Sequence, residues 1–269
     1  MRIRIVDAFT DRPFAGNPAG VVLLDAFPDD AWMQRVAAEV NLSETAFAHP
    51  DAGGSGADWQ LRWFTPVAEV DMCGHATLAT AHVLFDSGAV DGEVRFATRS
   101  GTLTTARHPD GSYGMDFPAA PLTAATAPEG LAEALGADPV SVQDTGPYVG
   151  DLLVELADES TVRGLGPDFR ALAAYSRRGV IATARADAPG RGYDYVSRCF
   201  FPNVGVDEDP VTGSAHTALA PYWAHRLGNV LLTGLQASAR SGLVRTELRG
   251  ERVLLTGHAV TVIDGELHA

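Results

Sequence analysis

The chain has 269 residues, 46% of them hydrophobic, and a formal charge of −14. This negative charge repels phosphate backbones and anionic membrane surfaces, so we expect neither nucleic acid nor membrane as a partner. The basic residues are all arginine, and without lysine the chain can form neither a Schiff base nor a phosphate-binding loop of the G-x-x-x-x-G-K-[ST] type. Two cysteines and the lack of a long apolar segment predict a protein of the reducing cytoplasm.

Apolar periodicity predicts the elements of the first part of the chain. A strand over residues 3–9 precedes a turn-rich loop and a short strand over 21–24. Helical spacing of apolar residues follows the start signal Pro28-Asp29-Asp30 and extends to Val40. The pattern then indicates a strand over 59–65, a helix over 74–85 and several short strands between 94 and 117.

The second part of the chain begins with residues 118–129, which are rich in Ala, Thr and Pro and lack apolar periodicity. This composition is typical of a linker between two halves. Beyond it, the sequence predicts helices over 130–135, 168–175 and 213–227, strands over 151–156, 180–184 and 193–201, and a strand-rich tail over 237–267.

An internal repeat relates the two parts of the chain. The segment Arg62-Trp63-Phe64-Thr65-Pro66 is matched by Arg198-Cys199-Phe200-Phe201-Pro202, and Val70-Asp71 by Val206-Asp207, all at an offset of 136 residues. Each segment is followed by a turn of small residues and an Ala-rich helix. We therefore expect two similar halves, residues 1–117 and 118–269, with a final strand that could pair back with the first half.

The two turns are candidates for chemistry because each precedes a helix. A helix start carries free N–H groups and partial positive charge, and small residues such as Gly74, Gly213 and Ser214 let an anion approach. Two such starts facing one cleft would cradle a substrate carboxylate. The alternative is a pair of ordinary helix caps, with Thr212 or Ser214 as the capping residue.

Several segments, in order, resemble the PhzF-like phenazine-biosynthesis family. They are Val6-Asp7-Ala8-Phe9, Phe14-Ala15-Gly16-Asn17-Pro18-Ala19-Gly20-Val21, Asn41-Leu42-Ser43-Glu44-Thr45, Cys73-Gly74-His75-Ala76-Thr77 and Glu208-Asp209-Pro210-Val211-Thr212-Gly213-Ser214-Ala215. The resemblance implies a diaminopimelate-epimerase-like α+β fold, in which each half wraps a curved, mostly antiparallel sheet around a central helix. It also implies a homodimer and an isomerase that needs no cofactor.

The resemblance further implies roles for individual residues. Glu44 would be the catalytic acid/base, while His75 and Asp209 would hold the substrate and assist a proton shift; in relatives that act on a phenazine precursor this substrate is a dihydro-hydroxyanthranilate. The family pattern differs at Gln236-Ala237, where Gln-Gly is frequent, and at Arg240-Ser241-Gly242, where the family has Arg-Pro-Gly or Arg-Pro-Ser. The residues assigned to binding a small carboxylate-bearing substrate are Asn17, Ser43, Gly74, Gly213 and Ser214.

The residues around Glu44 do not decide whether it is an ordinary exposed glutamate or a functional one. Burial between Leu42 and Ala46 would raise its pKa and suit it to proton transfer near neutral pH. The role of His75 is undecided in the same way, since a lone histidine is more often structural than catalytic. Asp209 could be an ordinary turn residue before Pro210.

Cys73 occupies the position of a catalytic thiol in two-cysteine racemases of this fold. The repeat places Asp209 opposite it, and Cys199 lies ten residues too early, so we expect Cys73 to be a small buried residue. An amino-acid racemase of the same fold and a non-catalytic binding protein stay open as alternatives. We expect no metal, since the spacing of Asp71, Cys73, His75 and His82 fits no zinc pattern, and no NAD, since no strand leads into a Gly-rich dinucleotide turn.

Overall fold

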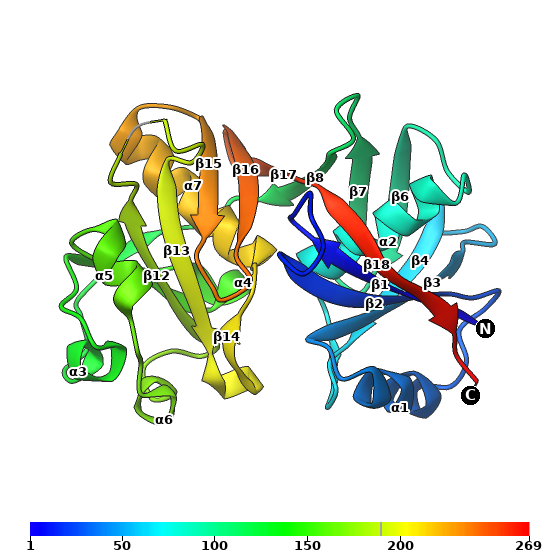
Figure 1. Ribbon diagram of the computed structural model, residues 1–269, viewed down its shortest axis with the longest axis horizontal. Helices are drawn as coiled ribbons and strands as arrows, with labels where there is room; N and C mark the ends of the chain where they lie inside the picture. The colour runs from blue at the N-terminus through cyan, green and yellow to red at the C-terminus, as the bar shows by residue number, and fades with distance from the viewer. Residues whose placement is uncertain (189, 269) are drawn as a thin grey trace. The chain divides into compact units, whose positions relative to one another are not determined.

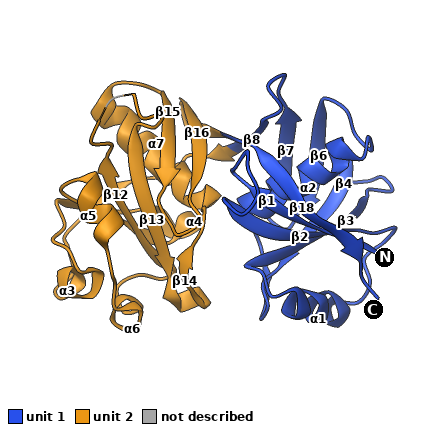
Figure 2. Ribbon diagram, in the orientation of Figure 1, with its two compact units in different colours: residues 1–116, 256–269 blue, residues 117–255 orange. Residues whose placement is uncertain are grey.

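The chain passes between two units at Asp116–Phe117 and again at Leu255–Thr256. Figures 1 and 2 show both units in the computed structural model, which describes residues 1–188 and 190–268. Unit 1 contains the first 116 residues and the segment from Thr256 onward, and unit 2 contains Phe117–Leu255. None of the helices in the described residues has the length and apolar character needed to cross a membrane.

Unit 1 is a mostly antiparallel sheet with two helices. Its strands pair in the order β18-β1-β2-β3-β4-β6-β7-β8, β5 lies beside β4, and the β2–β3 and β4–β6 pairs are parallel. The elements are β1 (Arg2–Ala8), β2 (Asn17–Leu23), α1 (Asp30–Val40), β3 (Glu44–Pro50), β4 (Trp59–Phe64), β5 (Glu69–Val70), α2 (Gly74–Asp86), β6 (Glu93–Thr98), β7 (Gly101–Arg107), β8 (Tyr113–Pro118) and β18 (Ala259–Glu266).

Unit 2 repeats this arrangement. Its strands pair in the order β9-β10-β11-β12-β13-β15-β16, β14 lies beside β13, and the β11–β12 and β13–β15 pairs are parallel. The elements are β9 (Thr123–Ala125), α3 (Leu131–Leu135), β10 (Ser141–Asp144), α4 (Gly146–Val149), β11 (Asp151–Glu155), α5 (Glu159–Gly164), α6 (Phe169–Leu172), β12 (Gly179–Arg185), β13 (Tyr195–Phe201), the 3₁₀ turn η1 (Pro202–Val204), β14 (Val206–Asp209), α7 (Gly213–Leu227), β15 (Leu231–Gln236), β16 (Gly242–Arg249) and β17 (Arg252–Gly257).

The 136-residue repeat corresponds to β4–β5 in unit 1 and β13–β14 in unit 2. Arg62 on β4 forms a two-bonded ion pair with Glu69 at 2.7 Å, and its guanidinium lies 5.2 Å from the Phe64 ring centre. Arg198 on β13 forms the same pair with Glu208 at 2.7 and 2.9 Å, and lies 5.1 Å from the Phe200 ring. The repeated Arg and Phe residues thus make similar contacts in each unit, although the paired glutamates, Glu69 and Glu208, are not related by the 136-residue offset.

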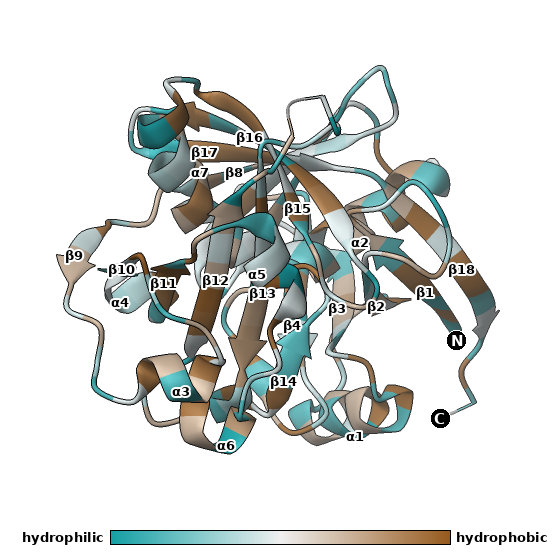
Figure 3. Ribbon diagram, turned by 60° about the vertical axis from the view of Figure 1, so that its left-hand side comes forward, coloured by the Kyte–Doolittle hydropathy of each residue, from teal (hydrophilic) through white to brown (hydrophobic). Residues whose placement is uncertain are grey.

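A buried helix crosses the sheet of each unit. Every residue of α2 from Gly74 to Ala81 is buried, and so is every residue of α7 from Gly213 to Ala220. These helices can be covered on all sides because they consist largely of Ala, Thr and other small residues, which allow close approach of the strands. Figure 3 shows the strands around them, with β12 largely in the hydrophobic colour. The predicted α+β fold of two similar halves is confirmed.

The stretch 118–129 differs from the linker that its composition predicts. It lies in unit 2 and contains β9, where Ala125 pairs with Val142 of β10. Short edge strands of this kind form through backbone pairing rather than through a buried face, so apolar periodicity gives no sign of them. At the other end of the chain, β18 pairs with β1 along its length, from Arg2–Glu266 to Ala8–Ala259.

Candidate active site

Glu44 owes its position to the way helix α1 ends. Asn41 adopts the left-handed conformation, with φ of 53°, and its backbone N–H donates to the Ala37 carbonyl. Asparagine tolerates this conformation better than most residues, and it stops the helix. The chain then turns and begins β3 at Glu44, whose side chain is 18% exposed.

Asn17 and His75 reach Glu44 from two other elements. Asn17 opens β2 directly after Gly16, where φ is +65° and a Cβ would lie 2.1 Å from the Ala8 carbonyl oxygen, so only glycine fits. His75 is the second residue of α2 and is buried. Three chain segments that lie far apart in sequence therefore bring polar side chains to one place in unit 1.

Hydrogen bonds join Ser43, Asn17 and His75, and the His75 ring in turn contacts Glu44. The Ser43 hydroxyl donates to Asn17 Oδ1 at 3.1 Å, which turns the amide nitrogen of Asn17 toward His75 Nδ1 at 3.2 Å. Since Nδ1 accepts, the ring proton lies on Nε2, which is 3.2 Å from Glu44 Oε2. Cys73 Sγ lies 3.5 Å from Nδ1 on the Asn17 side.

His75 is uncharged at neutral pH. Burial lowers its pKa to about 3, because the ring loses the hydration that stabilises an imidazolium. The contact with Glu44 therefore joins a neutral imidazole donor to a carboxyl group and is not an ion pair. A neutral imidazole beside Glu44 does not favour the charged carboxylate as an imidazolium would, so Glu44 keeps its capacity to take up a proton.

We expect acid to destabilise the protein through its two buried histidines, because burial also lowers the pKa of His216 in unit 2 to about 3. The unfolded chain binds these protons below the ordinary pKa of 6.5, while the folded chain does not until pH approaches 3. This contribution to stability is complete above pH 6.5 and decreases as pH falls, by about 1.4 kcal/mol per pH unit for each histidine.

Urea unfolding between pH 7.5 and 4.5 measures this dependence. His216→Gln should reduce the slope of unfolding free energy against pH by the contribution of one histidine. The matched change at His268, whose side chain is 84% exposed, should leave the slope unchanged. Equal slopes for the wild type and His216→Gln would contradict the assignment.

Glu44, Cys73 and His75 are also the one group in the described residues whose ligand atoms lie close enough to hold a metal ion. Both ring nitrogens of His75 already face protein partners, Asn17 on Nδ1 and Glu44 on Nε2. Within the protein, Asn17 and Glu44 are thus the neighbours of the two ring nitrogens. His82, considered with this group from the sequence, contacts Tyr113 and Thr261 instead.

Asp209 ends β14 in unit 2 and is 8% exposed. Its Oδ2 accepts a hydrogen bond from the Thr212 hydroxyl at 2.5 Å. The amide of Gln236, at the end of β15, accepts from the Thr212 backbone N–H at 2.8 Å and donates to the Asp209 carbonyl at 2.8 Å. The turn that precedes α7 is therefore fixed to the neighbouring strand.

Neither central helix begins with a side-chain cap. Cys73 precedes α2 and Thr212 precedes α7, and neither side chain accepts from a helix N–H group. The capping role considered for Thr212 and Ser214 is wrong, because the Thr212 hydroxyl donates to Asp209 and the Ser214 hydroxyl accepts from Arg178 at 2.9 Å. Thr212, and not Asp209, is the residue of unit 2 that corresponds to Cys73, because it directly precedes α7. Three residues separate Asp209 from the start of that helix.

The predicted site residues fall into two groups. Asn17, Ser43, Glu44, Gly74 and His75 lie in unit 1, where side-chain contacts connect four of them and Gly74 begins the helix that carries His75. The second group lies in unit 2 around the start of α7, and its members are Asp209, Gly213 and Ser214.

Sequence reasoning missed a buried ion pair beside the second group. Arg178 forms two hydrogen bonds with Asp151, at 2.7 and 2.9 Å, and a third with Ser214. The Asp151 side chain is fully buried. No motif marks the pair, although an aspartate opening an apolar strand and an arginine preceding another are both unusual for buried strands.

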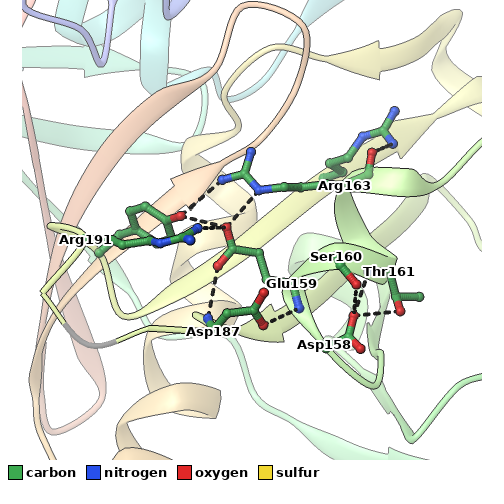
Figure 4. Close-up of polar contacts among 9 residues, drawn as sticks. Asp158, Glu159, Ser160, Thr161, Arg163, Asp187 and Arg191 are labelled. Carbon is green, nitrogen blue, oxygen red and sulfur yellow. Dashed lines mark hydrogen bonds and ion pairs between the residues drawn. The ribbon is translucent and has the colours of Figure 1, made fainter.

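Glu159 is a second buried carboxylate, and Figure 4 shows its surroundings. Oε1 accepts from Tyr193 at 2.6 Å and from Arg163 at 2.8 Å, and Oε2 accepts from the Asp187 backbone N–H at 3.0 Å. Arg191 lies 3.6 Å away. Because its oxygens already accept these bonds, we interpret Glu159 as an anchor for the segment between β12 and β13.

Comparison with known proteins places the chain in a family. The family model described as "Phenazine biosynthesis-like protein" matches residues 6–265. The chain belongs to this PhzC/PhzF family. A Pseudomonas aeruginosa protein named an uncharacterized isomerase is 51% identical over 267 residues, covering 98% of this chain and 97% of that protein.

Solved structures agree with this assignment. A PhzF-family phenazine biosynthesis protein from Enterococcus faecalis has a TM-score of 0.91 and 41% identity, and covers 100% of this chain and 99% of its own. A hydroxyproline epimerase from Agrobacterium vitis has a TM-score of 0.62 and 13% identity over 98% of this chain and 91% of its own. The second likeness shows the epimerase-like fold alone.

Proposed function

We propose that this PhzF-family chain is a cofactor-independent isomerase of a small carboxylate-bearing metabolite, in which Glu44 moves a proton between two carbon atoms. The observation that carries the proposal is the position of Glu44 beside a buried, neutral His75, whose ring is oriented by hydrogen bonds from Ser43 through Asn17. Glu44 supplies the carboxyl group, which is the group able to accept and return a proton near neutral pH. The name of the P. aeruginosa relative supports an isomerase.

The chemistry needs only an acid/base and hydrogen-bond donors. Glu44, as a carboxylate, removes a proton from one carbon of the substrate, and the electron pair shifts along the adjacent double bond. The protonated Glu44 then returns the proton to another carbon, so that product and enzyme regain their original charge. His75, whose Nε2 lies 3.2 Å from Glu44 Oε2, stays beside the carboxyl group in both steps and limits its movement.

We assign substrate binding to Gly74 in unit 1 and to Gly213 and Ser214 in unit 2. Both helix starts lack a side-chain cap, so their backbone N–H groups are suited to a carboxylate. Asn17 is fully buried and bonded to His75, so we propose that it positions His75. Dihydro-hydroxyanthranilate, the substrate implied by the family resemblance, is the first compound to test.

An amino-acid racemase of the same fold is less well supported. Such an enzyme needs two opposed acid/bases, and the two-thiol form uses a cysteine before each central helix. Thr212 stands before α7, and a threonine hydroxyl that donates to Asp209 is a poor proton acceptor. Cys199 is buried in β13, and burial raises its pKa well above the ordinary range of a thiol.

Deuterium exchange distinguishes these functions. The protein is incubated in heavy water with dihydro-hydroxyanthranilate and, separately, with L-proline, trans-4-hydroxy-L-proline and diaminopimelate, and proton NMR follows loss of each C–H signal. We expect exchange and isomerisation of the first compound only. Exchange at the α-carbon of an amino acid would favour the racemase. Binding of dihydro-hydroxyanthranilate without any exchange would favour a binding protein and contradict the proposal.

A further inference from the structure

Gln236 is a fully buried residue whose amide orientation is fixed by the backbone. Its Oε1 must face the Thr212 N–H, which can only donate, and its Nε2 must face the Asp209 carbonyl, which can only accept. Nε2 also lies 3.1 Å from Thr212 Oγ1. The amide therefore donates to the threonine hydroxyl rather than accepting from it.

This donation decides the direction of the next hydrogen bond. A hydroxyl has one proton, and with Gln236 occupying a lone pair, the proton of Thr212 points to Asp209 Oδ2. A hydrogen bond donated to a carboxylate stabilises its charged form. The series of bonds from Gln236 to Thr212 to Asp209 is thus a relay of donors that ends on a carboxylate.

We propose that Gln236 and Thr212 are positioning residues of the isomerase, which hold Asp209 ionised and fix one of its oxygens. This inference rests on the proposed function and on the role that the family resemblance implies for Asp209, which is to hold the substrate. Unit 1 has Thr98 in the place of Gln236, at the end of β6, and there the hydroxyl donates to the Gly101 carbonyl. The relay is therefore a feature added to unit 2 and not a part of the duplicated framework.

Other groups around Asp209 are the same in every variant used to test the relay. Arg178 and the Cys199 thiol both interact electrostatically with Asp209, and the Thr212 side chain also contacts the thiol. Asp151 forms an ion pair with Arg178. Because Arg178 and Asp151 are unchanged and burial raises the pKa of the Cys199 thiol, which keeps it neutral, a change in the titration of Asp209 reports on the relay.

The test measures Asp209 directly and needs no substrate. Carbon-13 NMR of protein labelled at the aspartate carboxyl carbons follows the titration of Asp209, whose signal is identified by its loss in Asp209→Asn. Thr212→Val keeps the shape of the residue and both bonds of Gln236 to the backbone, but removes the donated bond. We expect it to raise the pH midpoint of Asp209 by about one unit. Gln236→Met should raise the midpoint in the same direction.

Two further variants separate the relay from general packing. Thr212→Ser retains the hydroxyl and should titrate like the wild type. Thr217→Val removes a buried hydroxyl on α7 that donates only to the Ser214 carbonyl, and should also leave the midpoint unchanged. An unchanged midpoint in Thr212→Val, or an equal rise in Thr212→Ser, would overturn the proposal.

Activity provides a second, independent result. With dihydro-hydroxyanthranilate, Thr212→Val should lower kcat about tenfold or more with a smaller change in KM, and should shift the pH–rate profile, while Thr212→Ser restores both. If the wild type does not turn over this compound, the proposed substrate fails while the titration still decides the relay. Normal kcat and an unshifted profile in an active Thr212→Val enzyme would contradict the positioning role.

Discussion

Replacing Glu44 with glutamine is expected to lower isomerase turnover by about a thousandfold or more, with the fold intact. The amide has the size of the carboxyl group and can keep the contact with His75 Nε2, which is 3.2 Å in the wild type, but it cannot take up a proton. Circular dichroism and the thermal midpoint should match the wild type. The rate is measured as deuterium incorporation into dihydro-hydroxyanthranilate.

The matched control for this substitution is Glu39→Gln. Glu39 lies five residues earlier, on the exposed side of α1, so the same chemical change there should leave the rate within a factor of two. If Glu44→Gln retains a rate close to that of Glu39→Gln, Glu44 is not the acid/base. Loss of rate together with loss of folded signal would instead indicate a structural glutamate.

Removing the guanidinium of Arg178 is expected to destabilise unit 2 by about 3 kcal/mol. Arg178→Met leaves the carboxylate of Asp151 buried without its two hydrogen bonds. The side chain of Asp151 is fully buried, whereas that of Arg178 is 31% exposed, which places the effect at the lower end for buried pairs. The free energy of unfolding in urea at pH 7.5 measures the loss.

Two further variants make this prediction specific. The double variant Asp151→Leu with Arg178→Met removes both charges and should recover most of the lost stability, since the cost comes from the unpaired charge. Arg95→Met breaks an ion pair in which both side chains are at least 40% exposed, and should cost under about 1 kcal/mol. A double variant no more stable than Arg178→Met would show that the arginine acts mainly by packing.

Much of the fold could be predicted because local patterns agree with it. Helix α7 was expected over 213–227 and forms over Gly213–Leu227, since small apolar residues run between a Gly start and Gly228. The repeat around Arg62 and Arg198 predicted two similar halves. The family motifs also identified Glu44 and Asp209 as candidates, and the motif residues Gly16 and Asn41 have positive φ angles that few residue types adopt.

The partners of the candidate residues could not be predicted in the same way. Nothing in the sequence relates Gln236 to Thr212, or Asp151 to Arg178, because each pair is separated by more than twenty residues and meets only when strands pair. The sequence repeat also misplaced the equivalent of Cys73 at Asp209, since it does not show where the helix begins.

The sequence by itself determined the family, the duplicated α+β framework and the carboxylates proposed for chemistry, since these follow from local periodicity and motifs. The tertiary structure decided what each polar group does. It showed that burial keeps His75 neutral, that Asn17 fixes its tautomer, and that Thr212 donates to Asp209 instead of capping a helix. Protonation and hydrogen-bond direction depend on which atoms meet in a dry interior, and only the folded chain brings those atoms together.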